Sequence, residues 1–512
     1  MKTKEEYIVL RDGELESPWQ NGLKALNIAQ HPEKPDGIYD CVIVGAGITG
    51  ITAALNLQEA GKKTIVVDAY AVGFGTTGGT SAHINTFADT TYKEAESAFG
   101  ENGAKLFAEA ITEGYDIIDQ NINKYKIVCD YETKTGYVYA ETDDQVKQLQ
   151  DLYEGTVKVG VAVSYTDEVS FPVPYLKAIT LLGQAQFHPL KYLQGLQKAY
   201  IATGGTILEN TKIDSVVKEG DVLIAQSAQV NIKAKKVIYA THIPPNINVF
   251  NFSCAPYRSY IMAVKLRNDN YPDALIYDMQ EPYHYFRSHE IDGKKLLIVG
   301  GQDHKTGHED AEKSFEDLEK YVRKYFKVSS VKYKWSSQYY VPVDGLPYVG
   351  HLTFAADGIY CATGFNGNGM MLGSVSAKIL SDLVLKKENK YADLFSTSRI
   401  KPIDGFTEFV KENADVAYHF VADRIAVKET DSLKRIQPGD GKVVEYNGKK
   451  IAVYRDDKGE IHALSAICTH AKCVVNWNSE EKSWDCPCHG ARFDIDGKVL
   501  TGPATIDLPK IE

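Results

Sequence analysis

The sequence lacks a long uninterrupted apolar run. Its most apolar stretch, Val42–Leu57, is broken by three glycines, and the first six residues are mostly charged instead of forming the apolar core of a signal peptide. A helix needs about 20 consecutive apolar residues to cross a bilayer. We therefore expect no membrane span and a cytoplasmic protein.

The chain also lacks an excess of positive charge. It has 57 Lys and Arg against 68 Asp and Glu, a net charge of −11, and no run of basic residues. Nucleic acids and anionic membranes attract basic surfaces, so neither is an expected partner. With 512 residues, 44% of them hydrophobic and 24% charged, the composition predicts a globular protein of two or three domains.

Cysteine is scarce, but four of the eight cysteines lie within the last 45 residues. Cys468 and His470 form a Cys-x-His pair, and Cys486 and His489 form a Cys-x-x-His pair after fifteen further residues. Two loops that each supply one thiolate and one imidazole suit a 2Fe–2S cluster, with two cysteines on one iron and two histidines on the other. Zinc is the alternative, but zinc sites usually present Cys-x2-Cys or His-x3-His pairs.

This C-terminal segment, roughly residues 424–512, resembles a Rieske 2Fe–2S domain, and Pro487 and Gly490 are also typical of that family. The resemblance implies a small all-β domain in which the two Cys/His pairs hold the cluster. It also implies a disulfide between Cys473 and Cys488.

A second redox signature lies near the other end of the chain. An apolar, β-branched run over residues 39–44 leads into Gly45, Gly47 and Gly50, and a helical pattern and a second short strand then lead to Asp68. In such a unit the glycines let the backbone approach a pyrophosphate at the helix N-terminus, and the acid binds ribose hydroxyls. The acid also argues against NADP, whose 2′-phosphate it would repel.

Three later segments favour FAD over NAD. A loop rich in Gly, Thr and Ser covers residues 73–81, and a strand at 236–239 ends in Ala240 and Thr241. Residues 357–369 then lead into a helix whose amides and dipole would stabilise negative charge on a reduced flavin.

In this order the motifs resemble, over about residues 36–395, the D-amino-acid-oxidase-like FAD-dependent oxidoreductases. The resemblance implies that FAD is bound by residues of all these segments, with Val216 beside the adenine: Gly45, Gly47, Ile48, Thr49, Gly50, Asp68, Ala69, Thr76, Thr77, Ser81, His83, Val216, Ala240, Thr241, Gly364, Asn366, Gly367, Asn368, Gly369 and Met370.

The implied fold class is an α/β FAD-binding domain of the Rossmann-like, glutathione-reductase type with an α+β substrate domain, followed by a small all-β Rieske domain. The expected divisions are an N-terminal arm at 1–35, the oxidoreductase at 36–395, a linker at 396–423 and the Rieske domain at 424–512. Within the oxidoreductase we expect FAD-binding parts at about 36–89, 186–252 and 335–395 and substrate-domain parts at about 90–185 and 253–334.

Family members place substrate-binding side chains on a sheet that roofs the flavin. Here the candidate catalytic residues are His284, Tyr285, Arg287 and His304. Arg287 has the planar fork that binds a substrate carboxylate, although a structural ion pair would explain it as well. In sarcosine and dimethylglycine dehydrogenases a histidine placed like His83 is bonded to the flavin, but the tryptophan that usually precedes it is absent here, which favours noncovalent FAD.

Together these features predict an FAD-dependent dehydrogenase of a small amine or amino acid. Its electrons would pass through the cluster to an external one-electron acceptor protein or quinone. Two alternatives remain open: a reductase that runs from the cluster through the flavin to a substrate, and a non-catalytic redox sensor.

Overall fold

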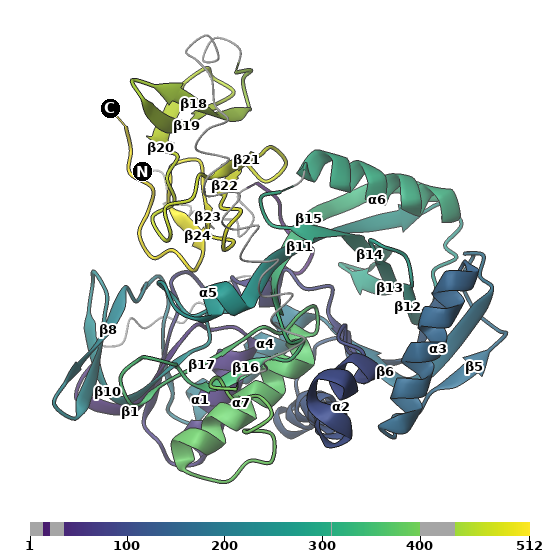
Figure 1. Ribbon diagram of the computed structural model, residues 1–512, viewed down its shortest axis with the longest axis horizontal. Coiled ribbons are helices and arrows are strands. Elements are labelled where there is room, and N and C mark those ends of the chain that lie inside the picture. Colours follow the sequence, from purple (N-terminus) through teal and green to yellow (C-terminus); the bar gives the residue numbers. More distant parts are fainter. Residues whose placement is uncertain (1–13, 21–34, 309, 400–435, 512) are drawn as a thin grey trace.

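A computed structural model of the chain describes residues 14–20, 35–308, 310–399 and 436–511. The expected N-terminal arm and linker therefore lie mostly outside the described residues. A large α/β body carries a small β module at one end, drawn in yellow in Figure 1. Among the described helices, none combines the length and apolarity that a membrane crossing requires.

The first sheet has eight strands in the order β16-β17-β10-β1-β2-β7, with the hairpin β8-β9 beside β10. Its centre is parallel, and every residue of β2 is buried, as expected for strands covered on both faces. The bounds are β1 (Ile38–Val44), β2 (Thr64–Val67), β7 (Thr206–Leu208), β8 (Ser215–Glu219), β9 (Val222–Gln226), β10 (Asn231–Tyr239), β16 (Tyr348–His351) and β17 (Ile359–Thr363). Helices α1 (Ile48–Glu59), α4 (Pro189–Ala202) and α7 (Gly369–Leu385) belong to this layer.

The second sheet has nine strands in the order β15-β11-β14-β13-β12-β4-β6-β3, with β5 beside β6. The bounds are β3 (His83–Ile84), β4 (Glu132–Ala140), β5 (Ser164–Thr166), β6 (Lys177–Gln186), β11 (Cys254–Leu266), β12 (Ala274–Asp278), β13 (His284–Ile291), β14 (Lys294–Lys305) and β15 (Val328–Pro342). The expected boundary between residues 334 and 335 thus falls inside β15.

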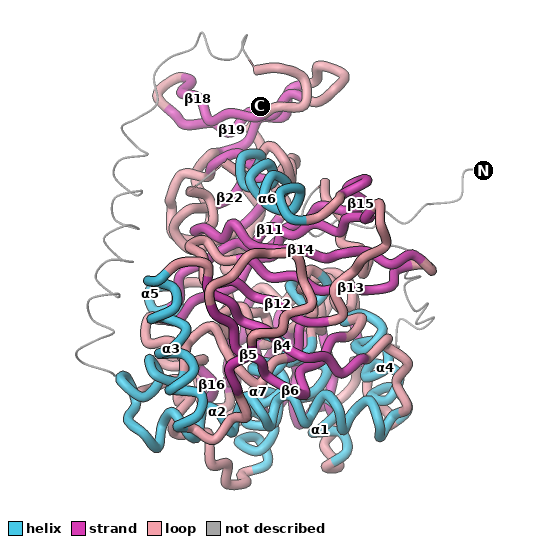
Figure 2. The backbone as a smooth tube through the Cα atoms, turned by 90° about the vertical axis from the view of Figure 1, so that its right-hand side faces the viewer, coloured by secondary structure: helices cyan, strands magenta, loops and turns pink. Residues whose placement is uncertain are grey.

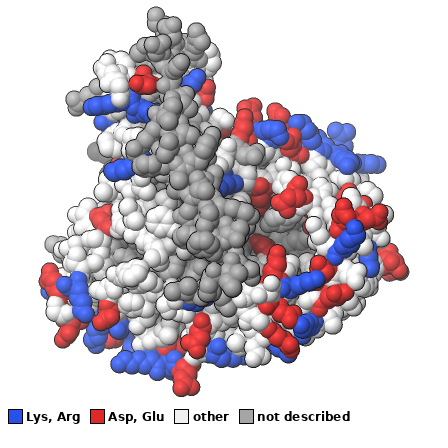
Figure 3. Space-filling view, viewed as in Figure 1, with Lys and Arg blue, Asp and Glu red and all other residues white. Residues whose placement is uncertain are grey.

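The remaining helices of the body are α2 (Tyr92–Tyr125), α3 (Asp143–Lys158), α5 (Phe250–Ser253) and α6 (Ala311–Tyr325), with a 3-10 turn, η1 (Thr76–Gly78). Helix α6 lies on the second sheet and buries Phe315, Leu318 and Val322 against it. Its outer face carries i,i+4 ion pairs, so basic and acidic side chains are interspersed there (Figure 3).

The C-terminal module contains two small antiparallel sheets. One comprises β18 (Gly441–Tyr446), β19 (Lys449–Arg455) and β20 (Ile461–Ser465), and the other β21 (Asn476–Asn478), β22 (Ser483–Asp485), β23 (Arg492–Phe493) and β24 (Val499–Thr501). Figure 2 shows β18 and β19 farthest from the body and β22 near β11. The predicted fold class is confirmed: a layer of α/β type with a parallel centre, a second layer of α+β type with a mostly antiparallel sheet, and an all-β module.

Candidate functional site

A cavity of roughly 570 Å³ lies between the two large sheets. One wall is made by the segments that follow β1, β2 and β10, and the other by side chains of β11, β12, β13 and β15. In open α/β sheets ligands bind outside the carboxyl ends of the strands, and this cavity has that position.

The glycine-rich turn forms one end of the cavity. Gly45 has φ of 106°, and a Cβ there would lie 2.4 Å from the Ala240 carbonyl oxygen, so no other residue fits. Gly47, Ile48 and Thr49 line the cavity. Gly50 does not, and it serves packing instead, because a Cβ there would lie 1.9 Å from the Gly45 carbonyl oxygen.

The predicted ribose acid also lines this end, together with Ala69. The Asp68 carboxylate accepts hydrogen bonds from the backbone amides of Ala46 (2.8 Å) and Tyr70 (2.9 Å). Burial raises the pKa of Asp68, against the lowering effect of these two bonds. The carboxylate therefore holds the glycine turn and the loop after β2 together while facing the cavity.

The loop after β2 is held by its carbonyl groups. Four donors from three other segments bind four successive carbonyl oxygens: Ser17 Oγ to Gly78 (2.6 Å), Trp335 Nε1 to Gly79 (2.8 Å), Trp19 Nε1 to Thr80 (2.6 Å) and Arg287 Nε to Ser81 (2.7 Å). With its backbone fixed in this way, the loop presents Thr76, Thr77, Ser81 and His83 to the cavity.

His83 is an orphaned polar group on this wall. Its Nδ1 lies 3.0 Å from Ser81 Oγ, whereas its buried Nε2 has no hydrogen-bond partner among the described residues. Burial and the nearby Arg287 charge hold the pKa of His83 well below its usual value. A neutral imidazole with one unused nitrogen is the kind of group that a bound cofactor would complete.

The segment before α7 closes the other part of the cavity. Asn366, Gly367, Asn368, Gly369 and Met370 line it, as do Ala240 and Thr241 after β10. Gly364 does not line the cavity, and its φ of +76° instead turns the chain beside Pro342. The Asp89 carboxylate accepts from the Gly367 amide at 2.7 Å, and burial raises its pKa.

The predicted adenine neighbour, Val216, lies outside the cavity wall. Val216 lies on β8, where it pairs with Ala225 of β9, and is not part of the cavity wall. Lys212 and Ile213, in the turn before β8, line the cavity next to Asp68 and Tyr70 instead. The prediction placed the contact on the strand, but the chain approaches the cavity just before the strand begins.

Of the four catalytic candidates, the cavity wall contains only Tyr285 within the described structure. Successive side chains of a strand point to opposite faces, and His284 points toward α6, where it stacks on Tyr321 at 3.7 Å and bonds Asp278 at 2.8 Å. His304 faces the same way, with Nε2 3.0 Å from the Tyr260 hydroxyl. Neither histidine reaches the cavity.

Arg287 lies on the cavity side of β13 but is enclosed. Besides Ser81, it bonds the Phe187 carbonyl at 3.3 Å, and its guanidinium lies 5.2 Å from the Trp19 ring centre. Burial lowers the pKa of Arg287 to about 9. The side chain does not line the cavity, and in this structure it supports the loop.

Asp303 was not singled out from the sequence. It accepts from the Tyr339 hydroxyl at 2.7 Å, and Ser259 Oγ lies 3.0 Å from the Tyr285 hydroxyl. Burial raises the pKa of Asp303 to about 7, against hydrogen bonds from Ser259 and Tyr339 that lower it. A titratable carboxyl thus stands directly behind the tyrosines of the cavity wall.

The second candidate centre is in the β module. Cys468 and Cys486 hydrogen-bond to each other through their thiols, which lowers the pKa of Cys468 and raises that of Cys486. The rings of His470 and His489 lie 5.0 Å apart, and their buried nitrogens have no hydrogen-bond partner among the described residues. Two adjacent thiols and two adjacent unpartnered imidazoles fit a 2Fe–2S cluster with mixed ligands.

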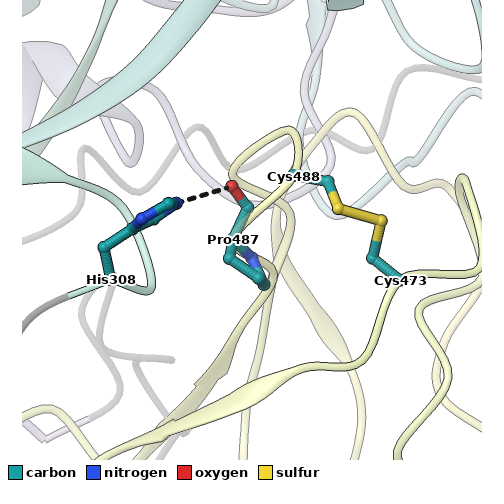
Figure 4. The surroundings of a disulfide bond; sticks show 4 residues. All are labelled: His308, Cys473, Pro487 and Cys488. Carbon is teal, nitrogen blue, oxygen red and sulfur yellow. Dashed lines mark hydrogen bonds between the residues drawn. A yellow bond between two sulfur atoms is a disulfide. The ribbon is translucent and has the colours of Figure 1, made fainter. Parts of the chain in front are cut away.

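The predicted disulfide between Cys473 and Cys488 is present (Figure 4). The sulfur atoms of Cys473, Cys486 and Cys488 lie within 4.8 Å of one another, but two of them are joined in this bond and cannot ligate a metal. The disulfide connects the two ligand loops, and the neighbouring Pro487 carbonyl lies 3.3 Å from His308 Nε2 of the body.

The module docks on the body through buried charges. Arg258 of β11 binds Glu481 at 2.6 Å, and both side chains are at most 1% exposed. Glu481 also binds Arg492, whose Nε lies 3.0 Å from Asp485. Glu481 was not predicted, because no sequence signal pairs residues 223 positions apart.

Family models match both parts of the chain. A model described as FAD dependent oxidoreductase (DAO) matches residues 40–383. The chain belongs to the DAO family of FAD-dependent oxidoreductases. A second model, described as Rieske [2Fe-2S] domain, matches residues 423–512.

One of the relatives spans both parts of the chain, and others cover about three quarters of it. YhfW of Bacillus subtilis, named for a Rieske 2Fe-2S iron-sulfur protein, is 33% identical over 476 residues, which cover 92% of this chain and 93% of that protein. Gamma-glutamylputrescine oxidoreductase of Escherichia coli is 23% identical over 415 residues, covering 76% and 93% respectively. The structure of glycine oxidase from Geobacillus kaustophilus superposes with a TM-score of 0.61 at 16% identity, covering 71% of this chain and 100% of that one, and shows a shared fold.

The protein therefore binds FAD and a Rieske-type 2Fe–2S cluster, and both predicted cofactors are confirmed. The residues present fit both groups. The body has a cavity with a glycine-lined turn and an unused imidazole nitrogen, and the module has paired thiols beside paired unpartnered imidazoles.

Proposed function

We propose that this oxidoreductase is a dehydrogenase of small amines that passes electrons from FAD through the cluster to an external one-electron acceptor. A substrate amine would lose two electrons and two protons from adjacent carbon and nitrogen, and water would hydrolyse the resulting imine to a carbonyl compound and an amine. FAD supplies the two-electron oxidation, and the 2Fe–2S cluster supplies one-electron transfer. The acceptor would be a protein or a quinone, and a cytoplasmic location stays a prediction.

We assign the cluster ligands as Cys468 and Cys486 on one iron and His470 and His489 on the other. FAD would extend from the glycine turn and Asp68, through the loop that carries Thr76 and Ser81, to the segment before α7. His83 would contact the flavin noncovalently.

The observation that carries this proposal is that one strand, β15, contacts both centres. Gln338 of β15 lines the cavity and donates its Nε2 proton to the Gly490 carbonyl at 3.0 Å, next to His489. The Tyr340 hydroxyl, two residues along, lies 3.4 Å from the His489 carbonyl. Electrons would therefore cross a short, packed protein path without a change in domain arrangement.

The substrate end of the cavity supports an amine over an amino acid. Four tyrosines line it, Tyr277, Tyr283, Tyr285 and Tyr339, together with Glu281. Aromatic faces and carboxylates attract cations.

Among the described residues of the cavity wall, the side chains with a fixed positive charge are Lys212 and Arg492. The first lies at the adenosine end, and the second is bound to Asp485 and Glu481. Neither is placed to bind a substrate carboxylate. The relative named for gamma-glutamylputrescine supports the same substrate class.

Anaerobic stopped-flow titration tests the proposal. Small primary and secondary amines should bleach the flavin first and produce the reduced-cluster EPR signal afterwards, whereas the matching α-amino acids should react at least tenfold more slowly. In a Cys486→Ser variant the flavin should still bleach, but reduction of a one-electron acceptor dye should stop. Cluster reduction before flavin bleaching would support the reverse direction, and no reaction with any amine would contradict the proposal.

A further inference from the structure

We propose that the Rieske module forms part of the FAD site, and that its segment Val499–Thr505 covers the adenosine half of the bound cofactor. FAD would then neither enter nor leave while the module is docked. This inference rests on the FAD placement proposed above, but it does not depend on the substrate or on the direction of electron flow.

The cavity wall itself supports this role. Val499, Leu500, Thr501, Gly502, Ala504 and Thr505 of the module line the same cavity as the glycine turn and Asp68. A dinucleotide lying on the turn would therefore have the first sheet beneath it and the module above it. Closure from both sides excludes water from the phosphates and strengthens their interaction with the turn amides.

The contacts of this segment identify which half of the cofactor it covers. The Tyr70 hydroxyl, two residues after the ribose acid, donates to the Val499 carbonyl. Lys212, beside the adenine-facing Ile213, lies 3.7 Å from the Asp507 carboxylate. The contacts of Tyr70 and Lys212 thus hold the module beside the expected positions of the ribose and the adenine.

A third contact comes from the segment after β10. The Asn246 amide donates to the Pro503 carbonyl at 3.0 Å, and Thr505 Oγ1 lies 3.1 Å from Asn246 Oδ1. The segment is thus held at two points, and Asp507 just after it supplies a third around the same end of the cavity. It reaches the body from above in Figure 1, where β24 faces the first sheet.

The buried ion cluster holds the module, and with it the segment over the cofactor, against the body, and we call this cluster the latch. Arg258 belongs to the body, whereas Glu481, Asp485 and Arg492 belong to the module. In the docked state both Arg258 and Glu481 are removed from water, and this cost is offset only by their pairing, so the docked state depends on it. Removing one partner of a buried pair leaves the other charge uncompensated and destabilises the docked arrangement.

The test is the rate at which FAD leaves the full-length holoprotein. Arg258→Gln opens the latch without altering the cavity wall, because Arg258 does not line it. With an excess of an FAD-specific apoprotein, such as the apoprotein of an FAD-dependent oxidase, as a trap for released FAD, we expect at least tenfold faster release than from the unaltered protein. Arg323→Gln, which removes an exposed ion pair on α6, is the matched control and should release FAD at the original rate.

Three further measurements distinguish undocking of the module from its loss. The EPR signal of the reduced cluster must persist in Arg258→Gln, so that faster release reports undocking and not loss of the module. If that variant does not retain the cluster, Tyr70→Phe, which removes one hydrogen bond to Val499, should still release FAD two- to tenfold faster. Hydrogen–deuterium exchange at residues 499–505 should be slower with FAD bound than without it.

An unchanged release rate in Tyr70→Phe, or in Arg258→Gln with its cluster intact, would overturn the proposal. Equal exchange at residues 499–505 with and without FAD would overturn it as well. None of these measurements involves turnover. A result that overturns this proposal would therefore leave the amine dehydrogenase assignment unaffected, and the reverse also holds.

Discussion

The two cofactor sites of this protein are built in opposite ways. The cluster site lies within residues 468–489, where two short loops are joined by the disulfide between Cys473 and Cys488. The wall of the FAD cavity is drawn from segments between Val44 and Thr505, which belong to both large sheets and to the Rieske module. Local covalent structure organises the first site, whereas tertiary packing organises the second.

The two sites should therefore be sensitive to different kinds of substitution. A change in a ligand loop should remove the cluster outright and leave the dinucleotide turn intact. A change far from the flavin can weaken the FAD site, because its walls depend on contacts between distant segments.

Replacing a ligand should separate the two sites completely. We expect Cys486→Ser to reduce iron content from two atoms per chain to near zero and to abolish the cluster EPR signal. At saturating FAD the same variant should still bind one FAD per chain. Cys361→Ser, a buried free cysteine on β17, is the control and should retain both cofactors. Loss of FAD binding together with iron would show that the sites are not separable.

Asp303 should make the stability of the body depend on pH. Burial raises its pKa from the ordinary 3.8 to about 7 in the folded protein, so the stability it contributes is present below about pH 4 and is lost as pH rises through 7. Asp303→Asn removes this loss. Between pH 4 and pH 8 the free energy of unfolding of Asp303→Asn should therefore rise by up to roughly 4 kcal/mol relative to that of the unaltered protein. Urea unfolding at both pH values measures the difference, and parallel pH profiles would contradict it.

Asp68 should contribute to FAD affinity through hydrogen bonds to a charged acceptor, each worth about 1.5–3 kcal/mol. We therefore expect Asp68→Ala to weaken FAD binding tenfold to a hundredfold in a titration of the apoprotein, with the cluster EPR signal unchanged. Asp221→Ala, in the exposed turn between β8 and β9, should bind FAD normally. Undiminished affinity in Asp68→Ala would remove this residue from the site.

The smallest expected effect concerns the cluster potential. Ala491 is fully buried in the second ligand loop, and its carbonyl accepts from the Cys486 amide at 2.8 Å. The hydroxyl of a serine at this position would donate a hydrogen bond toward the cluster, and this bond would favour the reduced state. Ala491→Ser should raise the midpoint potential by tens of millivolts, about the value of one neutral hydrogen bond. Ala452→Ser on β19 should not shift it, and a lower potential in Ala491→Ser would contradict the expectation.

The sequence was most informative where chemistry is local. The spacing of two Cys/His pairs and the glycines between a strand and a helix indicate cofactor type directly, because ligand geometry and backbone approach restrict the residues at each position. The fold class followed from the order of these motifs along the chain.

Side-chain direction and long-range pairing were harder to predict. Tyr285 and His284 are neighbours in sequence, yet strand alternation sends one to the cavity and the other beneath α6. Similarly, nothing in the local sequence of Arg258 indicates that its partner is Glu481 in another domain. Such features depend on register and packing, which a single sequence specifies only through the whole fold.

The short described segment that contains Ser17 and Trp19 has a practical consequence for protein production. It lies ahead of β1 and outside the matched family region that starts at residue 40, so a truncation designed on that boundary would discard it. Trp19 is fully buried and binds the Thr80 carbonyl in the loop beside the flavin cavity. A shortened protein that begins at β1 would therefore be purified with a loosened flavin loop, and its weaker colour would reflect the choice of first residue and not the natural affinity of the protein for FAD.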